Sequence, residues 1–352
     1  MKSTKTFPVT LAFLVLLILL AAAGIGAGWW LLFSGNSAGA GSAPVTVTIV
    51  EGAGTASIAR TLESVGIIDH AIVFRARVRF ANADARLRAG QYQLTPGTDY
   101  DALIAQLLAG PKKETVTVTI PEGKTLAQTA DIIAEKLPAA SADDFVALAS
   151  GAAATYVDRY SWLEGAYQGS LEGFLFPDTY QFEIDATAQT VIETMLSRFN
   201  DVWVGLEPRS ADSADFTDAE IVTIASLVER EVAVDEERVL VSSVINNRLN
   251  KGMRLQLCSS VQFLLPGKEK SKLRLTNADI ATESPYNTYL HEGLPPGPIA
   301  NPGRDALNAA LHPAKTKYLY FVLTGKDGSQ TFAATPAEFS KAKETSKRVF
   351  GE

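Results

Sequence analysis

The sequence predicts a mixed α+β protein, with an apolar N-terminal helix, small strand–helix units and a larger domain built around a Glu-bearing helix. Three observations support this prediction. Residues 7–33 are apolar and uncharged, the octapeptide VTVTIVEG at 45–52 recurs almost unchanged as VTVTIPEG at 116–123, and apolar residues recur at helical spacing from Ile221 to Val232. Alternation at period two indicates strands, whereas spacings of three and four residues indicate a helix.

The N-terminal segment has the features of a membrane span. Lys2 and Lys5 precede it, and the chain then has no charged residue until position 51. The apolar stretch is long enough to cross a hydrocarbon core, which needs about 20 residues. Trp29 and Trp30 suit a membrane interface, and the two lysines place the N-terminus in the cytoplasm.

We therefore expect residues 1–33 to form a cytoplasmic tip and a single transmembrane helix in the cell membrane, with the rest of the chain outside the cytoplasm. A cleaved signal peptide is the alternative, although its apolar region is usually only about 7–15 residues long. The small and polar residues at 34–43, SGNSAGAGSA, are typical of a flexible linker.

The region 44–138 contains the repeated octapeptide. Each copy alternates like a half-buried strand, ends in a turn and precedes a helix-like run, ASIARTLESVG or LAQTADIIAEKL. Between them, IVFRARVRF and DALIAQLLAG predict helices, and AGQYQLTPG at 89–97 predicts a strand and a turn. We expect one region with two related strand–helix units.

Residues 139–352 are expected to form the main domain. Its predicted elements are mostly helical segments up to 206, a long helix ending near 232, a helix at 236–249, a strand at 318–324 and a final helix at 336–350. Thr335 suits the N-cap of the last helix, with Pro336 at its first position and Glu338 completing a capping box.

Two glutamates lie near the end of the long helix. Glu231 follows the bulky Leu227 and Val228 by one turn, whereas Glu229 follows the smaller pair 225–226, which shields it less. A carboxyl held against apolar neighbours has a raised pKa and can retain a proton near neutral pH, as a general acid must. On the pattern alone, an ordinary solvated rim of the helix is the alternative.

Composition excludes several classes of function. The net charge is −7 and 20% of the residues are charged, which argues against a nucleic-acid binder with a basic surface. The single cysteine, Cys258, cannot form an internal disulfide. The three histidines are scattered, and His291-Glu292 has no second histidine at helical spacing, so we expect neither a metal nor a cofactor.

Several motifs occur in a fixed order through the second half of the chain. They are LEGFLFPDTY (171–180), IASLVERE, DEERVLVSSVINNRL, SPYNTYLHEGLPPGPIANPG (284–303) and ALHPAKTKYLYFVL (310–323). Together they resemble the endolytic murein transglycosylases, the MltG or YceG-like family. The resemblance implies that 139–352 is the catalytic domain of a lyase, and that the strand–helix units are LysM-like. LysM modules in other proteins bind N-acetylglucosamine polymers, but a spacer role for this region stays open.

The resemblance also assigns the chemistry. It places the catalytic acid at Glu231, which protonates the glycosidic oxygen between N-acetylmuramic acid (MurNAc) and N-acetylglucosamine (GlcNAc) and then, as a carboxylate, deprotonates the muramoyl C6 hydroxyl. The product carries a 1,6-anhydro-MurNAc end. A hydrolase usually needs two carboxylates, and only one lies in a convincing motif here.

The resemblance further implies substrate-binding residues, Tyr286, Asn287, Tyr289, Glu172 and Arg248. Aromatic and amide groups on a Pro- and Gly-rich loop suit sugar rings. A purely structural role for any single one of them stays open. The implied partners are peptidoglycan strands, the cell membrane and cell-wall synthases (penicillin-binding proteins), with a role in ending glycan elongation.

One segment departs from the family pattern. Where the family has an Asp-containing, TDPT-like run, this chain reads LQLCSS at 255–260, and Cys258 occupies the position of the Asp. Ser259, Ser260 or no residue takes over its role. The departure bears on efficiency and glycan preference more than on the class of reaction. Apart from it, two other functions remain as alternatives, a peptidoglycan hydrolase (muramidase) and a non-enzymatic glycan-binding scaffold.

Overall fold

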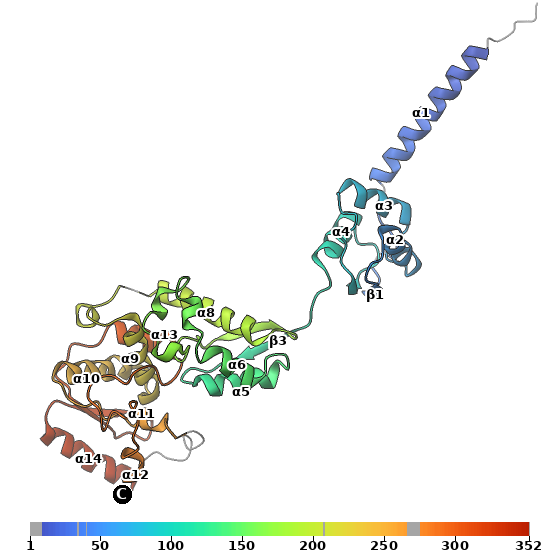
Figure 1. Ribbon diagram of the computed structural model, residues 1–352. Helices are drawn as coiled ribbons and strands as arrows, with labels where there is room; N and C mark the ends of the chain where they lie inside the picture. Colours follow the sequence, from blue (N-terminus) through green and yellow to red (C-terminus); the bar gives the residue numbers. More distant parts are fainter. Residues whose placement is uncertain (1–8, 34, 40, 207, 266–274, 352) are drawn as a thin grey trace, which may run out of the picture. The chain divides into compact units, whose positions relative to one another are not determined.

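The structure is a computed structural model that describes residues 9–33, 35–39, 41–206, 208–265 and 275–351. The chain divides into two compact units, unit 1 (Met1–Lys113) and unit 2 (Glu114–Glu352) (Figure 1). The described residues form helices together with three separate two-stranded antiparallel sheets. The predicted α+β class is confirmed.

The predicted apolar segment forms helix α1 (Val9–Phe33). Within the part of the chain that the structure describes, no helix meets both the length and the apolarity that crossing a membrane requires. The transmembrane helix therefore stays a prediction.

The linker predicted after the apolar segment is tied to unit 1. The Asn36 side-chain amide donates to the carbonyls of Ile67 and Thr98, both at 2.8 Å, and the Ser37 amide donates to Asp69 Oδ2 at 2.7 Å. This differs from the expected flexible linker. Asn and Ser have short polar side chains that readily bond nearby main-chain groups, so the same composition also suits an ordered turn.

Unit 1 has the strand–helix–helix–strand order that the sequence predicts. Its elements are β1 (Val45–Ile49), α2 (Thr55–Ser64), α3 (Ala71–Phe80), β2 (Gly90–Leu94) and α4 (Tyr100–Ala109). Strands β1 and β2 pair antiparallel, with Val45 opposite Leu94. Alternate residues such as Val47 and Tyr92 point inward and pack with buried side chains of the helices, Phe74 among them. The core buries one face of the sheet, as the period-two pattern requires.

The second octapeptide belongs to unit 2. It forms β3 (Thr115–Thr119), which pairs antiparallel with β4 (Thr179–Glu183). The units therefore divide after Lys113, whereas the sequence suggested one region up to residue 138. The reason is packing, because Val118 of β3 and Phe182 of β4 lie in the core of unit 2.

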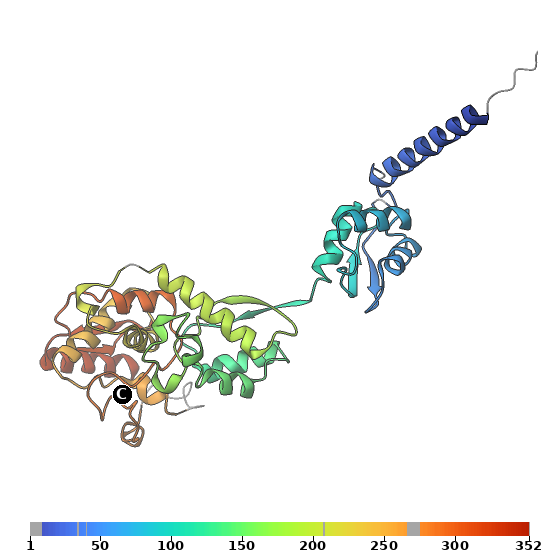
Figure 2. The ribbon, with the colours of Figure 1, turned by 45° about the horizontal axis from the view of Figure 1, so that its top comes forward.

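Unit 2 contains the remaining helices and strands. The longer elements are α5 (Leu126–Lys136), α6 (Ala142–Ala149), α8 (Ala188–Val204), α9 (Asp218–Glu231), α10 (Arg238–Asn250), α13 (Arg304–Leu311), β5 (Tyr320–Leu323), β6 (Gln330–Ala333) and α14 (Pro336–Phe350). The shorter helices are α7 (Ala153–Tyr156), η1 (Ser161–Leu163), η2 (Tyr167–Gly169), η3 (Ala211–Ser213), η4 (Asp235–Glu237), α11 (Cys258–Gln262) and α12 (Asn277–Ile280). Figures 1 and 2 show the β3–β4 ribbon beside α8, with α5 and α6 next to it.

Helix α9 is the central element of unit 2, and α10 and α13 pack against it. The predicted long helix, second helix and C-terminal strand are confirmed as α9, α10 and β5. The capping box of α14 is confirmed as well, since the Glu338 amide donates to Thr335 Oγ1 at 3.3 Å and the Thr335 amide donates to Glu338 Oε2 at 3.1 Å.

Candidate active site

Helix α9 carries both glutamates that the sequence singles out. It begins with a capping box in which the Glu220 amide donates to Thr217 Oγ1 at 3.2 Å and the Thr217 amide donates to Glu220 Oε2 at 2.8 Å. All residues from Ile221 to Val228 are buried, and the last turn, 229–231, is half-buried. A rigid, buried helix thus holds the two carboxyl groups at its C-terminal end.

Glu231 is the last residue of α9, and two protein groups hold it. Its Oε1 accepts a hydrogen bond from the Ser259 amide at 2.9 Å, and its main-chain carbonyl accepts one from Gln330 Nε2 at 2.7 Å. Burial raises the pKa of the Glu231 carboxyl, whereas Ser259 and the Arg230 guanidinium oppose that shift. A carboxyl in such surroundings can hold a proton near neutral pH and also give it up.

Two more polar groups lie close to Glu231. The Cys258 thiol and the Tyr289 hydroxyl are hydrogen-bonded to each other, with 3.2 Å between Sγ and Oη. Burial raises the pKa of both groups, and the nearby charge of Glu231 adds to both shifts. The thiol and the hydroxyl are therefore neutral at neutral pH, and Tyr289 is the predicted sugar-binding residue that lies beside the acid.

Glu229 has different partners. Its Oε2 accepts a hydrogen bond from the amide of Gly303 at 3.1 Å, and Gly303 is the N-cap residue of α13. Burial raises the pKa of Glu229, the Gly303 amide lowers it, Glu122 raises it further and Arg238 lowers it. The sequence spacing suggested much weaker shielding of Glu229 than of Glu231, but burial raises the pKa of both carboxyls.

Glu172 is a buried structural carboxyl, with only 9% of its surface exposed. Both of its oxygens accept from the Leu126 amide, at 3.0 and 2.9 Å, at the first residue of α5. Burial raises the pKa of Glu172 to about 8, opposed by the amides of Leu126 and Gly173 and by Arg230. These contacts join the loop before β4 to the start of α5.

Asn287 shapes the loop that carries Tyr289. It is completely buried, and its side-chain amide donates to the carbonyls of Ile280 (3.0 Å) and Thr282 (2.8 Å). Its Oδ1 accepts from the Tyr289 amide at 3.0 Å. Both ends of the Asn287 amide are thus engaged by the main chain of its own loop.

Arg248 is bound in the same way by main-chain carbonyls. It is 8% exposed, its Nε donates to Leu319 O at 2.6 Å, and its Nη1 donates to Leu255 O at 2.6 Å and to Arg254 O at 3.1 Å. Its guanidinium also lies over the Tyr320 ring, 5.2 Å from the centroid. Arg248 therefore joins the residue that precedes β5 to the LQLCSS segment.

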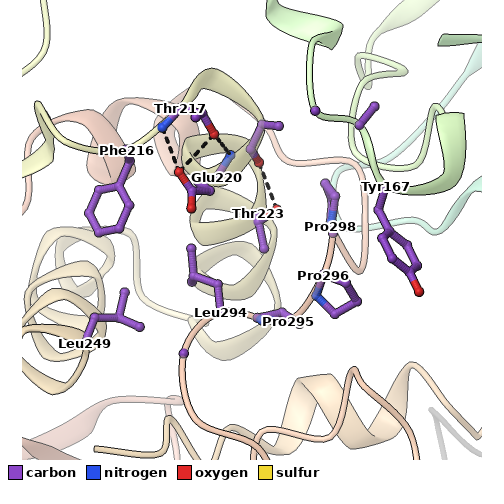
Figure 3. A pocket seen from close by; sticks show the side chains of 15 residues that line it. Tyr167, Phe216, Thr217, Glu220, Thr223, Leu249, Leu294, Pro295, Pro296 and Pro298 are labelled. Carbon is purple, nitrogen blue, oxygen red and sulfur yellow. Dashed lines mark hydrogen bonds between the residues drawn. The ribbon is translucent and has the colours of Figure 1, made fainter. Parts of the chain in front are cut away.

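A cavity of about 520 Å³ lies near the other end of α9. In Figure 3, the N-cap residue Thr217 and Glu220 and Thr223 of α9 lie on one side of it, and Leu294 and the prolines of the 293–298 loop lie on the other. Glu220 and Glu231 are separated by eleven residues, or about 16 Å along a helix. Glu231 does not line this cavity.

Tyr286 lies near the rim of that cavity. Its ring contacts Tyr167 edge-on, with centroids 6.0 Å apart, and Phe263 at 5.0 Å. Burial raises the pKa of Tyr286 to about 12, and the charge of Glu172 adds to this shift. The predicted substrate-binding residues are thus divided, with Tyr289 beside Glu231 and Tyr286 beside Glu172.

Three residues hold the site in addition to the assigned site residues, and of these the sequence pointed only to Ser259, as one candidate for the role of the family's Asp. Ser259 and Gln330 bind Glu231 directly. Asn301 is completely buried, and its Oδ1 accepts from the amides of Gly173 (3.0 Å) and Leu175 (3.1 Å). Asn301 lies in the NPG end of the recognised loop motif, which was a usable signal. Gln330 has none, because it is the first residue of the four-residue strand β6, QTFA, and belongs to no quoted motif.

Among the residues that the structure describes, no group of three or more His, Cys, Asp or Glu side chains is arranged to hold a metal ion. The chemistry available at Glu231 is that of a carboxyl with raised pKa, surrounded by hydroxyl, thiol and amide groups.

Comparison with known proteins gives consistent matches. The model of the YceG-like family matches residues 47–345. An endolytic murein transglycosylase of Bacillus subtilis is 34% identical over 311 residues, 85% of this chain and 84% of that protein. One of Streptococcus pneumoniae is 33% identical over 346 residues, 92% of this chain but 62% of that protein, so this chain spans less than two thirds of its length. A crystal structure of a YceG-like protein from Listeria monocytogenes matches with a TM-score of 0.55 and 31% identity, covering 85% of this chain and 99% of that one.

Proposed function

The chain belongs to the YceG-like family, and we propose that it is an endolytic peptidoglycan lytic transglycosylase, a lyase that cleaves β-1,4 bonds between MurNAc and GlcNAc. The relatives from Bacillus subtilis and Streptococcus pneumoniae are named for this activity. The observation that carries the proposal is the setting of Glu231, a half-buried carboxyl of raised pKa whose Oε1 accepts from the Ser259 amide.

The proposed reaction uses one carboxyl twice. Protonated Glu231 donates its proton to the glycosidic oxygen, the bond from that oxygen to C1 of MurNAc breaks, and GlcNAc leaves with a new hydroxyl. The Glu231 carboxylate then takes the proton of the muramoyl C6 hydroxyl, whose oxygen bonds to C1 and closes the 1,6-anhydro ring. No water is consumed, and Glu231 ends protonated for the next cycle.

The neighbours of Glu231 favour this reaction over hydrolysis. A glycoside hydrolase usually places a second carboxylate about 5–9.5 Å from the first, as nucleophile or as base for water. In the described part of the chain, the groups that most affect the pKa of Glu231 are Ser259 and Arg230, and no carboxylate is among them. This favours a nucleophile supplied by the substrate itself.

Mass spectrometry of peptidoglycan digested by the full chain tests the proposal. We expect fragments with 1,6-anhydro-MurNAc ends. Fragments with reducing MurNAc ends would instead establish a muramidase, and intact strands would establish a non-enzymatic glycan-binding scaffold. Either of these outcomes would overturn the proposal.

Within the site, we assign sugar contacts to Tyr289 and Tyr286, because aromatic groups suit sugar rings. Asn287, Glu172 and Arg248 support these contacts from behind, since their polar atoms bond main-chain groups. A conservative test is Tyr289→Phe, which should raise KM for glycan strands while leaving the folded state intact.

We also propose that the enzyme is anchored in the cell membrane, with its N-terminus cytoplasmic and both LysM-like unit and catalytic unit outside. The support is the uncharged apolar sequence of residues 7–33 and its helical conformation over 25 residues. The protein should then stay in the membrane fraction after an alkaline wash. A soluble mature form that begins after residue 34 would favour a cleaved signal peptide.

The β1–α2–α3–β2 arrangement of unit 1 supports its assignment as LysM-like. If it binds glycan, a protein with this unit intact should bind purified sacculi more tightly than one in which it is deleted. Equal binding would favour the spacer role. By cutting nascent strands near the membrane, the enzyme would end glycan elongation, with penicillin-binding proteins as the expected partners.

A further inference from the structure

Ser259 contacts the carboxyl of Glu231 directly. It follows Cys258 in α11, is 2% exposed, and its amide donates to Glu231 Oε1 at 2.9 Å. The segment reaches the acid through an unusual turn, because Gln256 adopts a φ of +51°, a conformation that non-glycine residues seldom adopt. The chain is thus bent so that Ser259 meets the end of α9.

The hydroxyl of Ser259 is buried and makes no hydrogen bond of regular geometry among the residues that the structure describes, yet it lies close enough to the Glu231 carboxyl to lower the pKa of that group. The neighbouring Ser260 differs, since its Oγ bonds both Leu257 O (2.9 Å) and Thr288 Oγ1 (2.8 Å). Buried hydroxyls are nearly always paired, because leaving one unpaired is costly. The hydrogen bond from the Ser259 amide to Glu231 therefore keeps the Ser259 hydroxyl next to the Glu231 carboxyl, where it is available as a donor.

We propose that Ser259 is a positioning residue for the reaction, whose hydroxyl donates a hydrogen bond to the Glu231 carboxyl when that carboxyl is ionised and releases it when the carboxyl is protonated. This role rests on the proposed function, in which Glu231 must exist in both states during one cycle. No bond other than the hydrogen bond changes, and the proton itself stays with Glu231 or the sugar.

The surroundings of Glu231 explain why such a donor is useful. Burial disfavours the ionised carboxyl, and a hydrogen bond to the ionised form offsets this. The charged or titratable groups that act with Glu231 are Arg230 on its own helix, Cys258 of α11 and Tyr289 of the facing loop. The thiol and the phenol are neutral at neutral pH, so Ser259 stabilises the carboxylate without adding a charge.

The test is a ¹³C NMR titration of the full chain labelled at the glutamate Cδ. The Glu231 signal is assigned by its absence in Glu231→Gln. Ser259→Ala removes the hydroxyl but keeps the amide, so we expect Glu231 to titrate about one pH unit higher than in the parent. Ser259→Thr keeps a hydroxyl and should titrate close to the parent.

Ser260→Ala is the matched control, because it removes a hydroxyl one residue away that does not bond Glu231. It should lower the melting temperature without moving the Glu231 titration. If Ser259→Ala does not fold, Ser259→Cys gives the same reading, because it keeps the volume of the side chain and offers only a weak donor. An unchanged Glu231 titration in the variant without the hydroxyl would overturn the proposal.

The titration does not depend on turnover, so the two proposals can fail separately. If Ser259→Ala raises the pH at which Glu231 titrates, and raises the alkaline limb of the pH profile of kcat by the same amount, both the proposed function and the proposed role of Ser259 are supported. A shifted titration in a protein that yields no anhydro ends would contradict the proposed function and support the assigned hydrogen bond.

Discussion

The two flanks at the end of helix α9 carry carboxyl groups only two residues apart in the sequence. Burial raises the pKa of both Glu229 and Glu231. Their partners differ, however. Glu229 bonds the amide of Gly303 and lies among charged groups, whereas Glu231 bonds the amide of Ser259 beside a neutral thiol and phenol.

This comparison shows that a raised pKa does not by itself identify a catalytic acid. On the Glu229 flank, the carboxyl caps helix α13 and is coupled to Glu122 and Arg238, which are structural tasks. On the Glu231 flank, the surrounding groups can hydrogen-bond a sugar, or can form and release a hydrogen bond as the Glu231 carboxyl changes its charge. The hydrogen-bond partners of Glu229 and Glu231 distinguish the two carboxyls, whereas the direction of their pKa shifts does not.

The largest expected effect comes from Glu231→Gln. The amide keeps the shape of the side chain but cannot donate or accept the catalytic proton, and loss of a positioned acid/base typically costs about 10²–10⁴-fold in rate. Because the proposed reaction uses Glu231 in both half-reactions, we expect turnover to fall by roughly 10⁴-fold, measured by release of anhydromuropeptides from isolated glycan strands. The melting temperature should match that of the parent.

A third carboxyl, Glu172, tests whether a raised pKa can be purely structural. Its pKa is about 8 instead of 4.5, so between these values the folded state holds a proton that the unfolded state has lost. The contribution of Glu172 to stability should therefore be fully present below pH 4.5 and be lost as the pH rises through 8, by at most about 4–5 kcal/mol. Thermal unfolding at several pH values measures this fall.

Glu172→Gln is the matched variant, because it keeps an acceptor for the Leu126 amide and does not titrate. We expect its melting temperature to depend much less on pH between 5 and 9. An unchanged pH dependence would mean that another group titrates in this range, and Glu172 would then no longer serve as the structural reference for Glu231.

Local features of this comparison could be predicted from the sequence. The helix that carries Glu231 and the capping box at Thr335 depend on residues within a few positions of each other, so periodicity and cap residues suffice. The pairing of β3 with β4 could not be predicted, because the partner strand lies some sixty residues away and the octapeptide looks like β1. The Ser259 contact depends on the turn at Gln256, which has no sequence signature.

Behind the Glu231 flank, Arg248→Ala should cost stability more than substrate affinity. The change leaves the buried carbonyl of Leu255 and the partly buried carbonyls of Leu319 and Arg254 without their donor, which we estimate at about 3 kcal/mol. Arg248→Lys should not restore the stability, because an ammonium cannot span the same carbonyls. A raised KM with an unchanged melting temperature would instead place Arg248 in contact with the glycan.

The smallest effect is expected on the other flank, from Glu229→Gln. The amide oxygen still accepts from Gly303, and the repulsion by Glu122 is removed, so stability should change by less than about 1 kcal/mol. Turnover should fall by less than about tenfold, the equivalent of 1.4 kcal/mol. If Glu229→Gln is inactive while Glu231→Gln still cleaves, the roles of the two flanks are reversed.

The most direct test of the central claim, that the single carboxyl of Glu231 does the work of both acid and base without water, is digestion of glycan strands in H₂¹⁸O followed by mass spectrometry. We predict anhydro-MurNAc ends with no ¹⁸O at the cleaved C1, because the muramoyl C6 oxygen closes the ring. Reducing ends that carry ¹⁸O would contradict the account, since they require a water nucleophile and a second group to activate it.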